Sequence, residues 1–309
     1  MIDTVTLNPS LDRTVTVEEL VIDEASRWTS LRRDPGGKGI NVARVVHELG
    51  GQTIAYGFMG GIDGEALMHL LKQQGVPFDF THINGEIRSN FIITDLKTRR
   101  QTRIDAPGPH ILRDELKSLI DKIAQIEPKS DFLVFAGSVP PGVPDDIYRQ
   151  LIEGAKKSGI KTVLDSDNKW LKEGIRAKPN VIKPNVHEAE ELLETHLGDE
   201  AAIVEAAKTL VKRGVDVAVI SRGKDGLIVA NGKKVLKATP PQVEVRSTVG
   251  AGDATIAALV LKLSQGDGIE EASRWAAAAG TASALTPGTE LCRREDVERL
   301  LHQVKVEQL

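Results

Sequence analysis

Short apolar runs rich in β-branched residues alternate along this chain with longer segments in which apolar positions recur at helical spacing. Each run is too short for a helix, so the pattern predicts buried strands at residues 4–7, 53–59, 132–136, 161–164, 180–182 and 215–220. The longer segments predict helices at residues 40–49, 64–74, 145–157, 189–193, 201–213 and 253–263. This alternation is typical of an α/β protein built on a mostly parallel sheet.

Two segments, residues 12–33 and 88–104, interrupt the alternation. Their polar and apolar residues alternate and no helix intervenes, which is typical of hairpin-like strands with one exposed face. We therefore expect a small antiparallel sheet, formed by residues 12–34 and 87–106 and inserted into a single domain over residues 1–309. An inserted sheet of this kind is the usual form of a lid.

The composition is that of a packed globular protein, with 40% hydrophobic and 27% charged residues among 309. Forty Lys and Arg against 44 Asp and Glu give a net charge of −4, and the interspersed signs argue against nucleic-acid binding. No apolar run approaches the roughly 20 residues of a membrane-spanning helix. Cys292 is the only cysteine, so it cannot form an intramolecular disulfide, and a cytoplasmic location is expected.

Polar residues and glycines follow every predicted strand. In an open parallel sheet, ligands bind outside the carboxyl ends of the strands, because loops and helix N-termini meet there. Turn chemistry alone explains glycine and aspartate in any one of these loops, but six such loops together favour a binding site. The segments are residues 8–12, 57–61, 137–138, 165, 183–185 and 221–223.

An apolar helix is predicted directly after the small-residue segment 247–253, Ser-Thr-Val-Gly-Ala-Gly-Asp. A helix N-terminus of this kind presents free N–H groups and a partial positive charge, which suit phosphate oxygens. Asp253 could accept a hydroxyl proton there while the amides of Ala251 and Gly252 bind a transferred phosphoryl group. The alternative is that Asp253 only caps the helix, because aspartate is a preferred N-cap residue.

A second glycine-rich segment, residues 35–43, also enters a helix. It is not a Walker loop, because Gly39 follows Lys38, and it is not a Rossmann fingerprint, because Val42 occupies the last small-residue position. Its backbone could approach a small ligand closely, with Asn41 pointing back from the first helical turn. Tight packing of the loop is the alternative.

Asn185 and Glu188 have the spacing of a capping box, which needs no ligand. The alternative is that Glu188 lies near magnesium or its waters, because hard cations prefer carboxylate oxygen. Arg27, Arg88 and Arg103 fall in the segments of the expected lid, where guanidinium groups could bind the phosphate of a sugar. Solubility alone explains any one of these arginines equally well.

Five ordered motifs together resemble the ribokinase-like PfkB sugar kinases, in particular the branch of phosphofructokinases and tagatose-phosphate kinases. The motifs span nearly the whole chain, at residues 6–12, 36–41, 137–142, 183–188 and 247–253. The resemblance implies a three-layer sandwich with an inserted β-sheet lid, and ATP-dependent phosphorylation of a sugar-phosphate hydroxyl. Lids of two subunits commonly pair in this family, and exposed strand edges are templates for pairing, so a homodimer is expected.

The resemblance also implies roles for individual residues. Asp253 would be the catalytic base, beside an anion hole of Gly250, Ala251 and Gly252. The sugar would be held by Asp12, Gly37, Asn41 and Ser138. The substrate phosphate would meet Arg88, and with it Arg27, Lys38 and Arg103. Magnesium, through Glu188, and the ATP phosphates would be organised by Lys183, Asn185 and Glu188, and the nucleotide would also contact Ser221, Gly223 and Thr248.

Some positions depart from the pattern of the family. Asn168 replaces a usual glycine, a change that the turn is expected to tolerate. Arg222 replaces a common leucine and would bring a cation beside the nucleotide phosphates. Several relatives use a monovalent cation near the loop at residues 285–289, which Glu290 follows here, so a monovalent cation is left open.

Fructose 6-phosphate is the preferred acceptor, because residues 140–142 and 288–292 look closest to the minor-type 6-phosphofructokinases. Fructose 1-phosphate and tagatose 6-phosphate are the alternatives. Two other classes are a non-catalytic sugar-phosphate sensor and a nucleotide-dependent dehydrogenase. The intact Asp253 argues against the sensor, and the failure of the Rossmann template at Val42 argues against the dehydrogenase.

Overall fold

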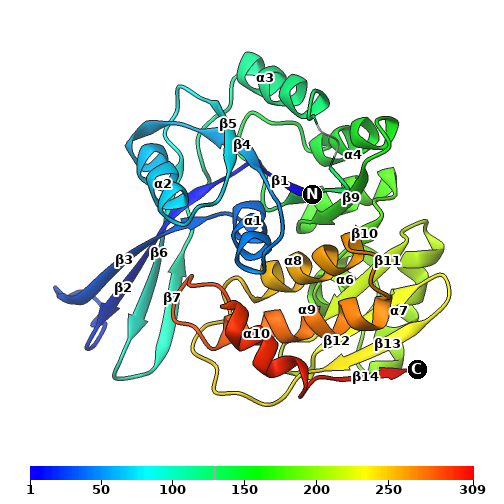
Figure 1. Cartoon of the computed structure of the whole chain (residues 1–309). Helices are drawn as coiled ribbons and strands as arrows, with labels where there is room; N and C mark the ends of the chain where they lie inside the picture. The colour runs from blue at the N-terminus through cyan, green and yellow to red at the C-terminus, as the bar shows by residue number, and fades with distance from the viewer. Residues whose placement is uncertain (128–129) are drawn as a thin grey trace.

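A large sheet forms the centre of the computed structural model, which describes residues 1–127 and 130–309 (Figure 1). From one edge to the other, its strands are β14 (Lys305–Gln308), β13 (Val235–Thr239), β12 (Leu227–Asn231), β11 (Val217–Ser221), β10 (Val181–Ile182), β9 (Lys161–Asp165), β8 (Phe132–Ala136), β1 (Ile2–Thr6), β4 (Ala55–Met59) and β5 (Phe78–His82). The strands from β5 to β11 are parallel, and β12, β13 and β14 pair antiparallel. The predicted mostly parallel sheet is confirmed.

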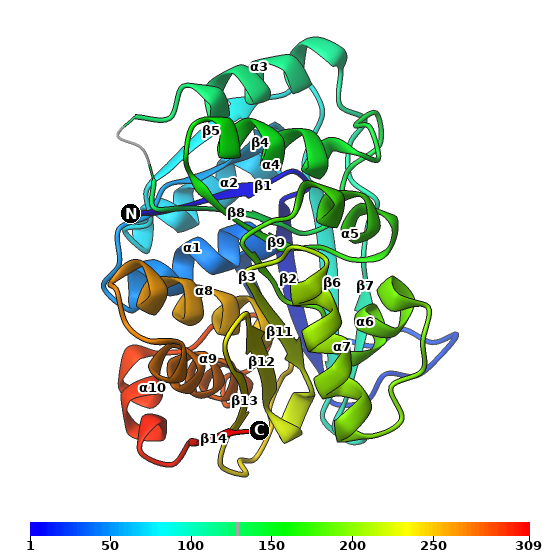
Figure 2. The same cartoon turned by 90° about the vertical axis from the view of Figure 1, so that its right-hand side faces the viewer.

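Helices cover both faces of this sheet, which gives the three layers that Figure 2 shows. One face carries α1 (Lys38–Glu48), α8 (Ala251–Ser264), α9 (Ile269–Ala284) and α10 (Arg294–Leu301). The other carries α3 (Arg113–Ala124), α4 (Ile147–Lys157), α5 (Asn168–Gly174), η1 (Ile175–Ala177), α6 (Val186–Leu193) and α7 (Glu200–Lys212). Helix α2 (Gly61–Gln73) packs against α1 and β4, and η2 (Gly223–Asp225) follows β11. In the described part of the chain, no helix is long and apolar enough to span a membrane.

The apolar runs form strands because their side chains are buried on both faces. In β8, Leu133 and Phe135 belong to the core under α3 and α4, whereas Phe132 and Val134 belong to the core under α8. Helix α8 is buried throughout residues 254–261, because it packs on the sheet and also against α1 and α9. A helix enclosed on all sides needs no polar face, which explains its continuous apolar sequence.

Every strand and helix predicted from the apolar pattern is present, with boundaries that differ by up to three residues. The pattern missed β5, the antiparallel strands β12, β13 and β14, and helices α3, α5, α9 and α10. β5, β13 and β14 mix polar with apolar residues, as in the Phe-Asp-Phe-Thr-His sequence of β5, and therefore lack a continuous apolar run. β12 was missed although residues 227–230 form a buried apolar run.

A smaller sheet consists of β3 (Trp28–Gly36), β2 (Ser10–Val17), β6 (Arg88–Asp95) and β7 (Arg100–Ile104), and it projects from the body of the molecule (Figure 1). We call it the small sheet. The predicted segments form it, but the expectation of an antiparallel sheet is wrong at its centre, where β2 and β6 are parallel. The reason is that β2 follows β1 and β6 follows β5, and β1 and β5 run in the same direction.

Candidate active site

A cavity of about 860 Å³ opens where the small sheet meets the carboxyl ends of the parallel strands. All the site residues predicted from the sequence line it except Arg27, which lies in an exposed segment before β3. Arg27 therefore does not line this cavity, and its contact with the substrate stays a prediction. The predicted residues that line the cavity are Asp12, Gly37, Lys38, Asn41, Arg88, Arg103, Ser138, Lys183, Asn185, Glu188, Ser221, Gly223, Thr248, Gly250, Ala251, Gly252 and Asp253.

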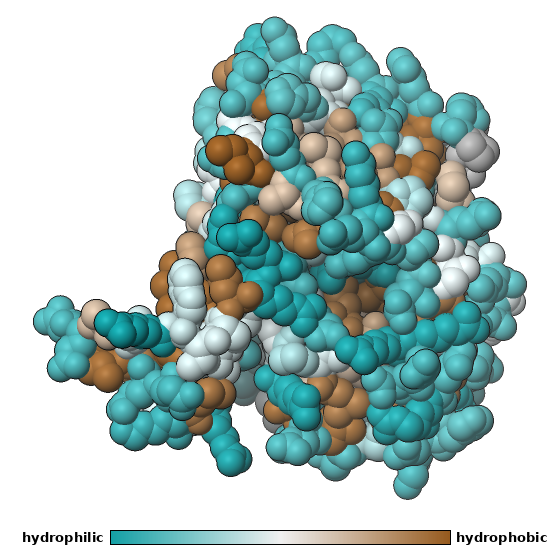
Figure 3. Space-filling view, turned by 60° about the vertical axis from the view of Figure 1, so that its left-hand side comes forward, coloured by the Kyte–Doolittle hydropathy of each residue, from teal (hydrophilic) through white to brown (hydrophobic). Residues whose placement is uncertain are grey.

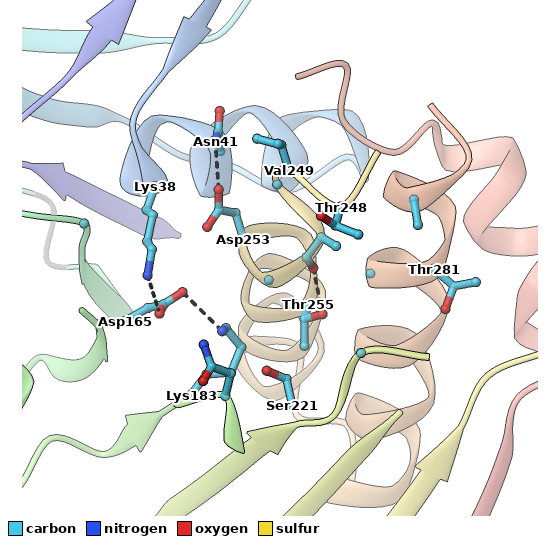
Figure 4. Close-up of a pocket in the computed structure, with 18 of the residues that line it drawn as sticks. Lys38, Asn41, Asp165, Lys183, Ser221, Thr248, Val249, Asp253, Thr255 and Thr281 are labelled. Carbon is cyan, nitrogen blue, oxygen red and sulfur yellow. Dashed lines mark hydrogen bonds and ion pairs between the residues drawn. The ribbon is translucent and has the colours of Figure 1, made fainter. Parts of the chain in front are cut away.

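Asp253 lies in the first turn of α8 and points across the cavity toward α1 (Figure 4). The N-cap of this helix is Gly250, so the alternative that Asp253 only caps the helix is wrong. Oδ2 of Asp253 instead accepts a hydrogen bond from Nδ2 of Asn41 at 2.8 Å. Asn41 thus points back from the first turn of α1, as its position in the glycine-rich segment predicted.

The proton affinity of Asp253 is set by its burial and its charged neighbours. Burial is the largest cause, and with the nearby charge of Asp165 it raises the pKa of Asp253 to about 6. Lys38, the Asn41 hydrogen bond and Lys183 act in the opposite direction. A carboxylate with this pKa is ionised at neutral pH but binds a proton far more readily than an exposed aspartate, which suits a general base.

Two lysines bracket Asp165, the last residue of β9 (Figure 4). Nζ of Lys38 lies 3.2 Å from Oδ1 of Asp165, and Nζ of Lys183 lies 3.5 Å from Oδ2. Burial disfavours the charged carboxylate, but the two ammonium groups outweigh burial and hold the pKa of Asp165 below its ordinary value. The sequence identified Asp165 only as one of several polar residues after a strand, because nothing local shows that it bridges two distant lysines.

Gly250 and Gly252 allow the N-terminus of α8 to approach its neighbours closely. Gly250 has φ 80°, and a Cβ added to it would lie 2.4 Å from a methyl group of Leu291. A Cβ on Gly252 would lie 3.1 Å from Nζ of Lys183. The helix N-terminus, with its partial positive charge, and a lysine ammonium therefore face the same part of the cavity.

The segment around Gly37 combines tight packing with a place in the cavity wall. Gly37 is the N-cap of α1 at φ 108°, and a Cβ on it would lie 2.7 Å from a methyl group of Thr6. Gly36 leaves equally little room beside the carboxylate of Asp12. The segment is therefore tightly packed and also lines the cavity through Gly37, beside Asp12, so the two interpretations of it, tight packing and a place near a ligand, are compatible.

Asp12 is held in place at the small-sheet end of the cavity. Its Oδ1 accepts hydrogen bonds from the hydroxyl of Ser10 at 2.7 Å and from Nδ2 of Asn90 at 3.0 Å. Burial raises the pKa of Asp12, against the hydrogen bonds and the nearby arginines. The sequence did not identify Asn90 as a site residue, because the pairing of β2 with β6 is what places it opposite Asp12.

Arg88 is a mostly buried cation whose guanidinium is bound by neutral groups. It donates to the backbone carbonyls of Asn8 and Ala106 at 3.0 to 3.3 Å. Burial lowers the pKa of Arg88, against the opposing effect of the nearby carboxylates of Asp105 and Asp12. Arg103, which also lines the cavity, pairs with Asp105 at 2.7 Å. This end of the cavity therefore suits an anion.

Asn185 and Glu188 form the predicted capping box at the start of α6. Oδ1 of Asn185 accepts from the Glu188 amide, and Oε2 of Glu188 accepts from the Asn185 amide, both at 2.8 Å. Both residues also line the cavity, and burial raises the pKa of Glu188. The described residues contain no group of three acidic, histidine or cysteine side chains that could hold a metal. The capping interpretation is confirmed, and a magnesium ion here would depend on phosphate and water oxygens for its other ligands.

Three positions that depart from the family pattern, Arg222, Glu290 and Asn168, lie in different parts of the structure. Arg222 pairs with Glu200 at 2.8 Å and does not line the cavity, so its charge is not directed at a nucleotide there. Glu290 pairs with Arg32 at 2.5 Å and with Arg293 at 2.7 Å. Asn168 begins α5, and its side chain lies outside the described residues.

The model of the pfkB family carbohydrate kinases matches residues 5–296 of this chain. The chain is 37% identical to the ATP-dependent 6-phosphofructokinase isozyme 2 of Mycobacterium tuberculosis, over 96% of this chain and 87% of that protein. It is 35% identical to the 1-phosphofructokinase of Borreliella burgdorferi, over 100% of this chain and 99% of that protein.

Among solved structures, the phosphofructokinase-2 of Escherichia coli in complex with substrates and products superimposes with a TM-score of 0.94. The two chains are 34% identical, and 98% of each is covered. The same E. coli protein has been solved with potassium and in a tetrameric inhibited form. The fold and family expected from the five motifs are thus confirmed, and the chain belongs to the PfkB family of carbohydrate kinases.

Proposed function

We propose that this chain transfers the γ-phosphoryl group of ATP to a hydroxyl of fructose 6-phosphate and forms fructose 1,6-bisphosphate. The observation that carries this proposal is the position of Asp253. Its carboxylate lies in the first turn of α8, directly after the small-residue segment 247–252, and lines the same cavity as Arg88. A sugar phosphate bound by Arg88 would extend its far hydroxyl toward the carboxylate.

Asp253 would accept the proton of that hydroxyl as the oxygen attacks the γ-phosphorus. The pKa of about 6 leaves the carboxylate ionised at neutral pH, and the Asn41 hydrogen bond holds Oδ2, so Oδ1 is the atom that would receive the proton. The transferred group would be stabilised by the N–H groups at the start of α8 and by Lys183, which lies beside Gly252. Because Asp165 fixes Lys38 and Lys183, their charges are positioned before the reaction begins.

The nucleotide would lie over Lys183, Asn185, Ser221, Gly223 and Thr248, which line the other part of the cavity. Magnesium would be bound mainly through phosphate oxygens and water, and Glu188, which lines the cavity, would supply a carboxylate to the ion or its waters. Magnesium supplies charge neutralisation on the phosphate oxygens when bound. A monovalent cation beside residues 285–289 stays part of the proposal, and the E. coli potassium complex supports it.

Fructose 6-phosphate, fructose 1-phosphate and tagatose 6-phosphate each carry a phosphate and a free hydroxyl at opposite ends of the sugar. Arg88 and Arg103 at one end of the cavity and Asp253 toward the other are compatible with this arrangement. The preference for fructose 6-phosphate therefore rests on the sequence motifs at residues 140–142 and 288–292. The other two sugars remain alternative acceptors.

The test is a coupled assay of ADP release with each of the three sugar phosphates and with magnesium present. We expect the highest kcat/KM with fructose 6-phosphate. A higher value with another sugar phosphate would replace the acceptor but keep the reaction. Absence of ADP release with all three would instead favour a non-catalytic sensor, and reduction of a nicotinamide would favour a dehydrogenase.

We also propose a cytoplasmic homodimer that pairs through the small sheet and closes it as a lid. Cross-strand register places Val15, Leu31, Phe91, Ile93 and Ile104 on one face of this sheet, and Phe91 and Ile104 are 40% and 55% exposed. Asp12 and Asn90 lie on the opposite face, toward the cavity. Figure 3 shows hydrophobic side chains on the projecting lobe. An exposed apolar face of this kind favours association with a second copy.

A further inference from the structure

Arg44 is a buried cation in the middle of α1, 8% exposed and one turn after Asn41. It does not line the cavity, although its contacts reach the residues that do. Its Nη1 donates to the backbone carbonyl of Pro35 at 2.9 Å and to Oδ1 of Asn41 at 3.2 Å. Its Nε donates to Oε1 of Gln74 at 2.9 Å, beyond the end of α2.

These contacts decide which way the amide group of Asn41 faces. A guanidinium can only donate hydrogen bonds. The oxygen of the Asn41 amide can therefore face it, whereas the NH₂ group cannot. With Oδ1 held by Arg44, Nδ2 points in the opposite direction and donates to Oδ2 of Asp253. The reversed amide would place an oxygen against the carboxylate and an NH₂ group against the guanidinium, and both contacts would be repulsive.

The charge of Arg44 also acts on this region of the protein. Burial lowers the pKa of Arg44, and the carboxylates of Asp34, Asp12 and Asp253 oppose that effect, whereas Arg32 adds to it. An enclosed cation carries a large desolvation penalty, which apolar residues of similar volume avoid when the only task is to join elements. The use of arginine here therefore points to a role for its charge and its donors.

We propose that Arg44 is a positioning residue for phosphoryl transfer, which orients the amide of Asn41 so that its NH₂ group faces the carboxylate of Asp253. This inference rests on the proposed role of Asp253 as the base. The helical spacing of three residues makes the arrangement possible, because positions i and i+3 lie on the same side of α1. The guanidinium is held in addition by the Pro35 carbonyl, which accepts from the same Nη1, and by Gln74, which accepts from Nε.

The charged groups that face Asp253 from the surrounding elements are Lys38 on α1, Asp165 on β9, and Lys183 after β10. A change at Arg44 leaves all three in place, and none of them contacts Arg44 through a hydrogen bond. Loss of Arg44 would remove the constraint on Asn41 and one positive charge from the neighbourhood of Asp253. Both effects favour the protonated carboxylate, so the acid limb of the pH–rate profile would move to higher pH.

The test is a double-mutant cycle between Arg44→Met and Asn41→Ala, read as kcat and as the pH dependence of kcat/KM. In the otherwise unchanged enzyme, we expect Arg44→Met to lower kcat by about 10- to 100-fold, the size found when residues that orient functional groups are removed. The acid limb should move to higher pH. In the Asn41→Ala background, the same substitution should change kcat by less than about threefold, because the group through which Arg44 acts is gone.

Gln74→Met is the matched control, because it removes a hydrogen bond of Arg44 but leaves the contact with Asn41. We expect it to alter thermal stability while the pH profile stays unchanged. If Arg44→Met does not fold, the cycle is repeated with Arg44→Lys, which keeps the charge but has a single donor nitrogen for the three acceptors that Nη1 and Nε serve in the arginine. A smaller loss of kcat that again disappears in the Asn41→Ala background would support the proposal.

Losses that simply add in either cycle, with an unshifted acid limb, would overturn the proposal and leave Arg44 as a structural tie. That outcome differs from failure of the proposed function, in which the unmodified protein would release no ADP with any of the sugar phosphates.

Discussion

Asn41 and Asp253 are 212 residues apart in the sequence, yet Nδ2 of Asn41 lies 2.8 Å from Oδ2 of Asp253. The hydrogen bond joins the two glycine-rich segments of the chain, one at the start of α1 and the other at the start of α8. These two helices pack against each other on the same face of the large sheet. Their packing brings the donor and the carboxylate together inside the cavity.

Asp253→Asn should lower kcat by about 10²- to 10⁴-fold, the contribution of a general base, because an amide cannot accept the proton of the sugar hydroxyl. The coupled ADP-release assay measures this loss, and circular dichroism checks the fold. Asp267→Asn, beyond the other end of α8, is the matched control and should retain full activity. An unaltered rate in Asp253→Asn would remove Asp253 from the reaction.

The pH dependence of kcat/KM should have an acid limb near 6, because the pKa of Asp253 is raised to about 6 and the base must be ionised. Below this pH the rate should fall roughly tenfold per pH unit. Initial rates at saturating ATP and low sugar phosphate give the profile. A rate that stays constant well below pH 6 would mean that another group takes the proton.

The same raised pKa has the opposite consequence for stability. The folded protein binds this proton more tightly than the unfolded chain, so the contribution of Asp253 to stability is present at acid pH and is lost as pH rises through about 6. Asp253→Asn replaces the buried carboxylate with a group that carries no charge at any pH. The variant should therefore have the same melting temperature at neutral pH as the unmodified protein, or a higher one. A clearly lower melting temperature at neutral pH would contradict this.

Arg88→Ala should raise KM for the sugar phosphate by about 10- to 100-fold, the equivalent of one or two hydrogen bonds to a charged group. KM for ATP should change little, because Arg88 lies at the small-sheet end of the cavity. Steady-state kinetics with each substrate varied in turn separate the two constants. Arg100→Ala, on exposed β7 outside the cavity, is the control. Equal increases in both KM values would mean that Arg88 does not act specifically on the sugar phosphate.

Asp165→Asn should destabilise the protein by about 3 to 5 kcal/mol, because it leaves Lys38 and Lys183 without their shared buried counter-charge. Urea unfolding measures the change. The pKa of Asp165 is held below its ordinary value, so its contribution should be present at neutral pH and be lost only as pH falls below the ordinary pKa of aspartate. Asp121→Asn breaks an exposed pair with Lys117 and should change the free energy of unfolding far less, because solvent screens this pair. Similar losses for both variants would argue against the bridging role.

Phe91→Glu should convert the proposed dimer into monomers, because it places a charge on the exposed apolar face of the small sheet. Analytical ultracentrifugation gives the mass of the assembly. Leu112→Glu is the matched control, since Leu112 is 47% exposed at the start of α3, a helix that packs against α4, β4 and β5. A monomeric unmodified protein, or a Phe91→Glu variant that stays dimeric, would rule out pairing through the small sheet.

The features predictable from the sequence are those that depend on neighbouring residues. Buried parallel strands need continuous apolar runs, helix N-termini need small residues, and Asn185 and Glu188 are only three positions apart in their capping box. These local patterns placed the strand ends and the two glycine-rich segments, and the resemblance to the PfkB kinases named site residues that, apart from Arg27, line the cavity.

The remaining features depend on contacts between segments far apart in the chain, which no local pattern encodes. The parallel pairing of β2 with β6 brings Asn90 to Asp12, and the packing of the core places Asp165 between Lys38 and Lys183. Arg222 lies outside the cavity because it forms an ion pair with Glu200, a residue distant from it in the sequence. Hydrogen bonds and ion pairs act over a few ångströms, so which groups they join, and hence the proton affinity of Asp253, follows only from the folded arrangement.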